Sequence, residues 1–153
     1  LGYKQPFTFL PGEFLSATGL EFNYTYSESE STDRDFMGNS FPLQSNSKHQ
    51  TNMILWYDKA GLNVRLAYNW KSKEYDGRFG LATQAEPISM GNWVEPQGYL
   101  DLSASYWLNE HISFTASGTE LTAQSRKSYS QYSNQFNSMW IQERRYNVGI
   151  TLT

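Results

Sequence analysis

The chain has 153 residues, of which 39% are hydrophobic and 16% aromatic, and its 15 acidic and 12 basic side chains give a net charge of −3. This balance excludes the basic surface that nucleic-acid binding requires, and the absence of cysteine from the sequence excludes a disulfide scaffold or a zinc-cysteine site. The sequence has no apolar run of transmembrane-helix length, yet its mean hydropathy of −0.63 also fits a membrane β-barrel, in which only alternate residues face lipid.

The first third of the chain predicts two strands and a long loop. Residues 1–9 alternate between apolar and polar, and Pro6 restricts this strand to an edge or bulged position. Residues 14–27 hold a second strand, in which the even positions from 20 onward are apolar and the odd positions polar. The polar residues 28–47 predict a long loop.

The stretch from residue 52 to residue 71 predicts a hairpin whose connection is residues 58–61. Its second strand alternates strictly, so that one face is wholly apolar while the other carries arginine, lysine and asparagine. The apolar face of this strand consists of Leu62, Val64, Leu66, Tyr68 and Trp70.

The rest of the chain repeats the same pattern. Residues 72–98 predict a second long loop and residues 124–138 a third. Three further strands are predicted, and the short turn 108–111 joins the first two of them. They lie at residues 99–107, 112–119 and 145–152.

The connections alternate between short and long along the chain, which is typical of outer-membrane barrels with short periplasmic turns and long extracellular loops. The apolar stripe at residues 62–70 has the length that a tilted strand needs to cross a bilayer. Tyrosines and tryptophans stand near strand ends, where amphipathic rings favour the headgroup region. We therefore predict an all-β fold, an antiparallel transmembrane β-barrel segment of about seven strands. The alternative is a soluble all-β binding module whose apolar faces meet in a core.

Seven antiparallel strands leave the first and last strands parallel, so they cannot close the even-numbered barrel of bacterial outer-membrane proteins. An open sheet in lipid would leave backbone N–H and C=O groups unpaired, at a cost of several kcal/mol each. We therefore expect the chain to be a piece of a longer protein, clipped at both ends, with its C-terminus on the periplasmic side.

Several segments have a recognisable order and spacing, among them Gly-Leu-Glu-Phe-Asn-Tyr-Thr-Tyr-Ser at 19–27 and Tyr-Leu-Asp-Leu-Ser-Ala-Ser-Tyr at 99–106. The others are at 10–12, 47–49, 57–59, 64–70 and 144–150. Together they cover nearly the whole chain apart from the loops, and they resemble the C-terminal barrel strands of TonB-dependent outer-membrane receptors. Two positions depart from the family pattern: Glu120-Leu121 stands where members usually carry Asn-Leu, and the family's terminal aromatic residue would fall one position beyond Thr153.

The resemblance implies a 22-stranded barrel with an N-terminal plug domain, located in the bacterial cell outer membrane. It further implies active import of a scarce nutrient with energy delivered through TonB, which would contact the missing N-terminal part. The expected partners are therefore outer-membrane lipid, the remainder of the barrel, the plug domain, TonB and a small-molecule or oligosaccharide ligand. The segments are most similar to those of proteobacterial receptors whose ligands are often oligosaccharides.

Aromatic residues in the predicted loops are the candidate ligand-binding residues, because flat rings with polar neighbours can stack on sugar faces. They are Tyr75, Phe79, Trp93, Tyr129, Tyr132 and Phe136. The alternative, which we weigh equally, is that these rings pack on one another. Charged residues on the polar strand faces are expected to line the barrel lumen, where they pair with each other or with water, or contact the plug or a passing ligand. They are Glu21, Arg65, Lys71, Asp101 and Arg145.

Motifs for catalysis, cofactors or metals are not found in the sequence, and an enzyme is not predicted because two isolated histidines form no triad. Residues 33–38 resemble a calcium loop only in part, because the fifth and twelfth positions of such a loop, which supply ligands, are occupied here by Met37 and Gln44. A solvated acidic loop is therefore favoured. The three predicted loops carry more acidic than basic residues. This balance disfavours an anionic iron chelate, which would need clustered arginine and lysine, and favours a neutral oligosaccharide.

Overall fold

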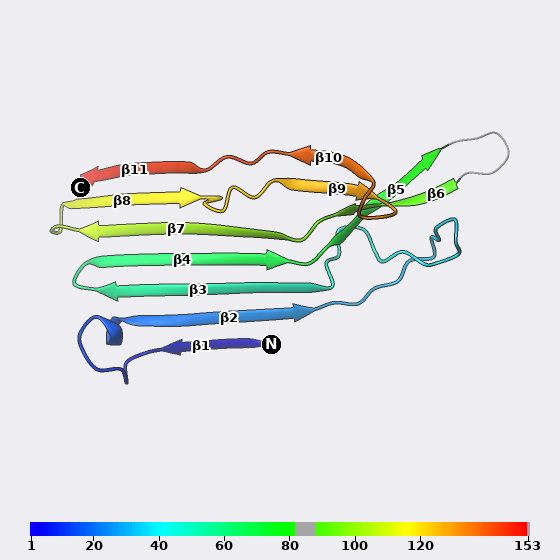
Figure 1. The fold of residues 1–153 in the computed structure, drawn as a ribbon. Helices are drawn as coiled ribbons and strands as arrows, with labels where there is room; N and C mark the ends of the chain where they lie inside the picture. The colour runs from blue at the N-terminus through cyan, green and yellow to red at the C-terminus, as the bar shows by residue number, and fades with distance from the viewer. Residues whose placement is uncertain (82–87, 153) are drawn as a thin grey trace.

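Seven strands form one antiparallel sheet, here called the main sheet, in which neighbours in space follow the order of the chain (Figure 1). The computed structural model describes residues 1–81 and 88–152, with the side chains of all of these except 79–81 and 88. Each strand of the main sheet coincides with a predicted one, so the all-β, antiparallel prediction is confirmed. The strands are β1 (Gly2–Pro6), β2 (Thr18–Tyr26), β3 (His49–Lys59), β4 (Leu62–Lys71), β7 (Gln97–Trp107), β8 (Ile112–Thr119) and β11 (Arg145–Leu152).

The main sheet is open, with β1 and β11 as its two edges. Both edge strands run toward the same end, at the left of Figure 1, where the short connections also lie. The long connections, which leave β2, β4 and β8, all start from the opposite end. The structure thus has the predicted alternation of short and long connections, and the sheet does not close on itself.

Two of the three predicted long loops contain strands, so that part of the prediction is wrong. β5 (Glu74–Leu81) and β6 (Ile88–Val94) lie between β4 and β7, while β9 (Arg126–Ser130) and β10 (Phe136–Trp140) lie between β8 and β11. They form a second antiparallel sheet, here called the small sheet, in the order β10-β9-β6-β5. Register shifts next to Tyr75 and Phe136 interrupt the alternation that would have revealed these strands.

Several strand ends also differ from the prediction. The connection predicted at 58–61 is only the pair Ala60 and Gly61, with φ of 53° and 78°, the left-handed conformation of a type I′ hairpin turn. Asp58 and Lys59 therefore still pair within the sheet. The first strand ends at Pro6, and a short 3-10 helix η1 (Leu15–Ala17) precedes β2.

One face of the main sheet is apolar, because residues directly opposite each other in neighbouring strands share a face. A central row reads Leu20, Leu55, Leu66 and Leu102 across β2, β3, β4 and β7. Among the strand positions of this face, the acidic or basic residues are Lys59 at the turn end and His49 at the opposite end of β3. The apolar face also includes Phe22, Tyr24, Met53, Tyr57, Leu62, Val64, Tyr68, Leu100, Tyr106, Phe114, Tyr146, Val148, Ile150 and Leu152.

The opposite face, here called the polar face, carries amides, hydroxyls and charges. One of its rows reads Asn23, Asn52, Asn69 and Tyr99. Trp56 is an exception, since its indole lies across β2 at Gly19, where a Cβ atom would overlap the ring. Ile54, directly opposite Glu21 and Ala67, and Trp107 also lie on this face, so the predicted contrast between the two faces holds for most strand positions and not for all.

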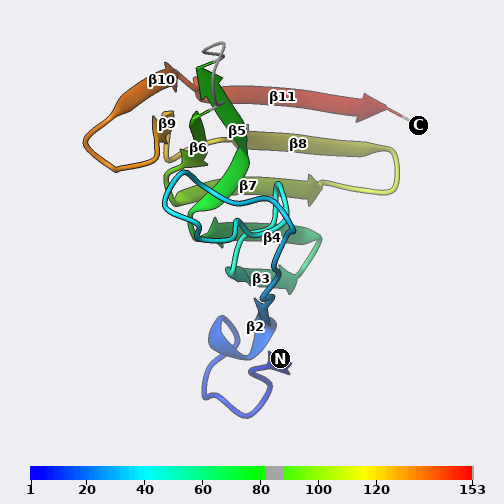
Figure 2. The same ribbon diagram turned by 90° about the vertical axis from the view of Figure 1, so that its right-hand side faces the viewer.

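Most of the buried apolar side chains lie at the small sheet and the loop between β2 and β3. Among the described residues, Phe41, Tyr75 and Val94 are buried there, and Ile54 is the one such side chain in the main sheet. Figure 2 shows this loop, in cyan, next to β5, and the Ser45 N–H donates to the Tyr75 carbonyl at 2.8 Å. Within the described part of the chain, no helix is long and apolar enough to span a membrane.

Candidate functional site

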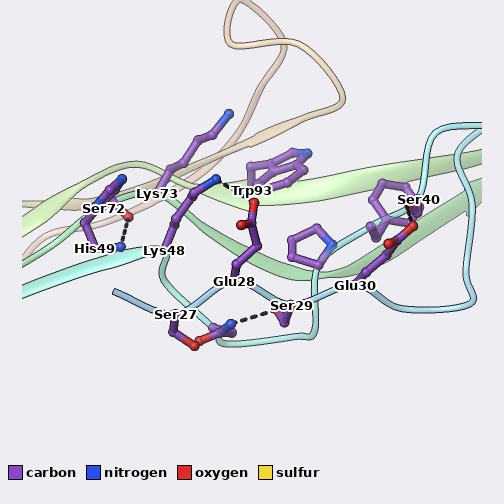
Figure 3. A pocket seen from close by; sticks show the side chains of 13 residues that line it. Ser27, Glu28, Ser29, Glu30, Ser40, Lys48, His49, Ser72, Lys73 and Trp93 are labelled. Carbon is purple, nitrogen blue, oxygen red and sulfur yellow. Dashed lines mark hydrogen bonds and ion pairs between the residues drawn. The ribbon is translucent and has the colours of Figure 1, made fainter. Parts of the chain in front are cut away.

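A cavity of about 580 Å³ opens where the small sheet meets the ends of β2, β3 and β4 (Figure 3). Polar side chains line it from residues 27–30 after β2, from Asn46, Lys48 and His49 before and at the start of β3, and from residues 72–73 after β4, and residues 40–42 of the loop between β2 and β3 line it as well. The small sheet contributes Trp93. The cavity therefore exists only when connections that are distant in sequence come together.

Aromatic stacking builds the apolar wall of the cavity. Phe41 stacks on Tyr75 with ring centroids 4.6 Å apart and an interplanar angle of 10°. Tyr75 in turn contacts Trp93 at 5.5 Å and 60°. The Lys73 ammonium lies 4.9 Å from the Trp93 ring centroid, a cation-π contact. These packed neighbours fix the orientation of the indole that lines the cavity.

An ion pair between Glu28 and Lys48 crosses the cavity wall, with Nζ and Oε1 2.8 Å apart. The Tyr26 hydroxyl donates to the other carboxylate oxygen of Glu28 at 2.9 Å. Hydrogen bonds from Lys48 and Tyr26 lower the pKa of the Glu28 carboxyl. The hydrogen bond to Glu28, followed by that to Tyr26, raises the pKa of the Lys48 ammonium. Both groups are charged at neutral pH, so their charges cancel.

Neutral groups supply the remaining polar surface of the cavity. The Ser29 hydroxyl accepts hydrogen bonds from the Asn46 amide at 2.7 Å and from the Leu43 N–H at 3.1 Å. The Ser72 hydroxyl accepts from the His49 N–H at 3.1 Å. Each hydroxyl can still donate a hydrogen bond. Such a surface, beside an indole ring, is suited to a ligand with many hydroxyl groups.

Asp35, which is 8% exposed, anchors the loop between β2 and β3 through hydrogen bonds. Its carboxylate accepts hydrogen bonds from the Met37 and Asn39 N–H groups at 2.9 and 2.8 Å and from the Gln131 amide at 2.8 Å. The Asn39 side chain, 3.1 Å away, is the main cause of a lowered pKa for Asp35. This carboxylate is thus a structural acceptor that links the loop to the β9–β10 connection. Across residues 1–81 and 88–152, no cluster of three or more potential metal ligands occurs.

The register brings four of the six predicted ligand-binding aromatics into one row across the small sheet. Trp93 lies directly opposite Tyr75 on β5 and Tyr129 on β9, and Tyr129 lies opposite Phe136 on β10. Exposure increases along this row from Tyr75, at 4%, to Phe136, at 69%. Because Tyr75 is buried, its ring contacts other side chains of the protein, which agrees with the alternative that these rings pack on one another. Trp93, in contrast, lines the cavity.

Of the other two predicted aromatics, Tyr132 does not line the cavity. Tyr132 is exposed in the connection between β9 and β10, where its hydroxyl contacts the Met37 sulfur at 3.4 Å. Phe79 belongs to β5, and its side chain is outside the described residues. Burial raises the pKa of both Tyr75 and Tyr129, with smaller contributions from Asp33 and Glu95 respectively.

The five charged residues predicted to face a lumen all lie on the polar face of the main sheet. They are Glu21, Arg65, Lys71, Asp101 and Arg145. Three of them have partners in the structure: Glu21 lies 3.7 Å from Lys4, Lys71 lies 2.9 Å from Glu74, and Asp101 accepts from the Glu120 N–H at 2.9 Å.

Sequence reasoning did not identify most residues of the cavity. Ser27, Ser29, Asn46 and Lys73 are unremarkable in sequence, and only the tertiary pairing brings them together. One signal was present, namely an aromatic residue and a proline at positions 41–42 inside an otherwise polar loop. Comparison with family models, curated proteins and solved structures yields no match for the chain.

Proposed function

We propose that the chain is part of an outer-membrane β-barrel receptor that takes up a nutrient by TonB-dependent transport, and that an oligosaccharide is favoured over an iron chelate as the nutrient. The observation that carries this proposal is the exposed apolar face of the main sheet. On β11 alone, Val148 is 88% exposed, Ile150 65% and Leu152 75%.

An exposed apolar face of this kind is expected to be buried against another protein surface or against lipid. Exposed apolar patches larger than a few hundred Å² mark surfaces that bind protein or membrane, since burying apolar area contributes about 25 cal/mol per Å². The small sheet lies beyond the ends of the main-sheet strands instead of over the apolar face (Figure 1). Lipid hydrocarbon is the cover that matches a face with no charge between its two ends.

The two-sided character of the main sheet supports a barrel wall. A membrane barrel presents its apolar face to lipid and its polar face to a lumen, with short turns at the periplasmic end and long loops outside. The main sheet has one apolar and one polar face, and its short connections lie at one end and its long connections at the other. A soluble binding module would instead need a second apolar layer over the same face, and the four strands outside the main sheet do not form one.

The open edges support membership in a larger barrel. Backbone groups along β1 and β11 face no further strand, and in lipid such groups must be paired. The 22 strands, the plug domain and the energy supply through TonB come from the family resemblance, and we include them in the proposal on that basis.

The cavity supports the choice of ligand. Its two acidic residues, Glu28 and Glu30, are matched by two basic residues, Lys48 and Lys73. A site that binds an anionic chelate would be expected to carry a net positive charge. An oligosaccharide can instead stack on the Trp93 ring and exchange hydrogen bonds with the surrounding serine and asparagine side chains.

The proposal is tested on the intact receptor that contains this chain. We expect it to fractionate with the outer membrane, to require detergent for solubility, and to bind neutral oligosaccharides roughly tenfold more weakly when Trp93 is replaced by Ala, because ring stacking is lost. Trp140→Ala, on an exposed indole of β10, is the matched control and should retain binding. A soluble monomer without detergent, or sugar binding unaffected by Trp93→Ala while chelate binding falls, would contradict the proposal.

A further inference from the structure

The Trp93 ring that lines the cavity is already in contact with a cation. The Lys73 ammonium lies over the indole, 4.9 Å from the ring centroid. Lys73 belongs to the two-residue connection between β4 and β5, and its side chain lines the cavity together with Trp93 (Figure 3). A cation at this distance is attracted by the electrons of the ring face. The ring face that Lys73 covers is therefore not free for a ligand.

Two neighbours of the indole approach it from different surroundings. Tyr75 contacts Trp93 at 5.5 Å between ring centroids, but Tyr75 is 4% exposed and does not line the cavity. Lys73 is exposed and does line it. The contact with Tyr75 thus belongs to the packed part of the molecule, and the contact with Lys73 belongs to the open side. A ligand in the cavity would meet the indole on the side where the ammonium lies.

The backbone on both sides of Lys73 is fixed by hydrogen bonds. The Ser72 N–H donates to the His49 carbonyl at 2.9 Å, and the Ser72 hydroxyl accepts from the His49 N–H at 3.1 Å (Figure 3). On the other side, Glu74 is buried and its carboxylate accepts from the Ser47 hydroxyl at 3.2 Å. Movement of Lys73 away from the ring is therefore a movement of its side chain and not of the backbone.

The ammonium is held less firmly than the other cation of the cavity. In the part of the chain that the structure describes, Lys73 forms no ion pair, whereas Lys48 is paired with Glu28 at 2.8 Å. A cation-π contact at an exposed position changes an equilibrium constant by about two- to fivefold. A ligand that stacks on the ring and makes hydrogen bonds as well can therefore displace the ammonium.

We propose that Lys73 is a built-in competitor for the Trp93 ring, which a sugar must displace before it stacks there. The inference rests on the proposed function and extends it, because it names a residue that determines specificity at the same site. A sugar ring stacks on an indole through its C–H groups and cannot occupy the same face as the ammonium. A ligand that offers stacking alone gains little, whereas one that also bonds to the serine and asparagine side chains of the cavity is retained.

The test compares two substitutions of Lys73 that act in opposite directions. The probes are neutral linear oligosaccharides of glucose, mannose and galactose, and the measurement is isothermal titration calorimetry on the intact receptor in detergent. Lys73→Gln removes the cation and should bind the sugars about two- to fivefold more tightly. Lys73→Arg keeps the charge but stacks more firmly on the ring, so it should bind them more weakly. The matched control is Lys127→Gln, on β9 and outside the cavity, which should bind like the unmodified receptor.

A second comparison checks that the effect of Lys73 passes through the ring. In a receptor that carries Trp93→Ala, Lys73→Gln should change the affinity no further, because no indole remains to be uncovered. An equal gain from Lys73→Gln with and without the indole would mean that the lysine acts through its charge alone, and would overturn the inference. A similar gain in Lys127→Gln would overturn it for the same reason.

The outcomes also separate this inference from the proposed function. If Trp93→Ala weakens sugar binding while Lys73→Gln leaves it unchanged or weakens it, the inference fails and the proposed function stands. Binding by Lys73→Arg that is as tight as binding by the unmodified receptor, or tighter, has the same meaning. If neither the unmodified receptor nor Lys73→Gln binds any of the sugars, both proposals fail.

Discussion

Leu66 lies in the middle of the apolar face, directly opposite Leu55 and Leu102. If this face contacts lipid, Leu66→Arg should lower the free energy of unfolding by about 2–4 kcal/mol, because the guanidinium would sit near the bilayer midplane. The control is Asn69→Arg, on the same strand and the polar face, which should be nearly neutral. Equilibrium unfolding of the intact receptor in lipid vesicles, followed by tryptophan fluorescence, measures both. Comparable destabilisation by the two arginines would show that the faces are not lipid-facing and lumen-facing.

At the scale of the element, the Asp35 carboxylate holds the loop between β2 and β3 in its folded conformation. Its pKa lies below the ordinary value of 3.8 because the folded loop donates hydrogen bonds to the carboxylate. The stabilisation is therefore complete above that ordinary value and is lost as the pH falls through the lowered pKa. We expect the Met37 and Asn39 amides to be protected from hydrogen exchange at pH 5 and to lose protection as the pH falls below about 3.8.

Replacing Asp35 by Asn should remove this pH dependence, since the neutral amide cannot accept all the hydrogen bonds that the carboxylate accepts. Exchange at Met37 and Asn39, relative to intrinsic rates, should then be fast at pH 5 as well. Asp33→Asn is the control, because Asp33 is more exposed and makes only a 3.6 Å ion pair with Arg78 through its side chain. If Asp33→Asn loosened the loop as much as Asp35→Asn, the loop would be held by its general charge and not by Asp35.

The seven strands of the main sheet were predictable because most of them have a long apolar stretch on one face, which alternation reveals directly. The strands of the small sheet were not. β5 and β10 carry register shifts that break the period, and β6 pairs with β9 across a long stretch of chain, which no local pattern encodes. Trp93 was identified because a loop aromatic is conspicuous, whereas Ser29 becomes part of a site only through long-range pairing.

At the scale of the whole molecule, the unpaired edges limit what the chain can do alone. We expect the 153-residue chain, expressed by itself, to aggregate or to fail to insert into lipid vesicles, because β1 and β11 present exposed ladders for pairing with other chains. Heat-resistant compact migration on a detergent gel is the measurement. The intact receptor is the control and should show it. Such migration by the isolated chain would mean that the sheet is complete without further strands.

The pairing of β6 with β9 also leads us to expect an order of events during assembly. β6 precedes β7 in the chain and β9 follows β8. The pairing of Asn92, Trp93 and Val94 with Ser130, Tyr129 and Ser128 therefore joins segments that are separated by the whole β7–β8 hairpin. Non-local contacts of this kind form late, because the intervening chain must first be ordered. The cavity depends on Trp93 being held there, so we expect the cavity to form only after this pairing.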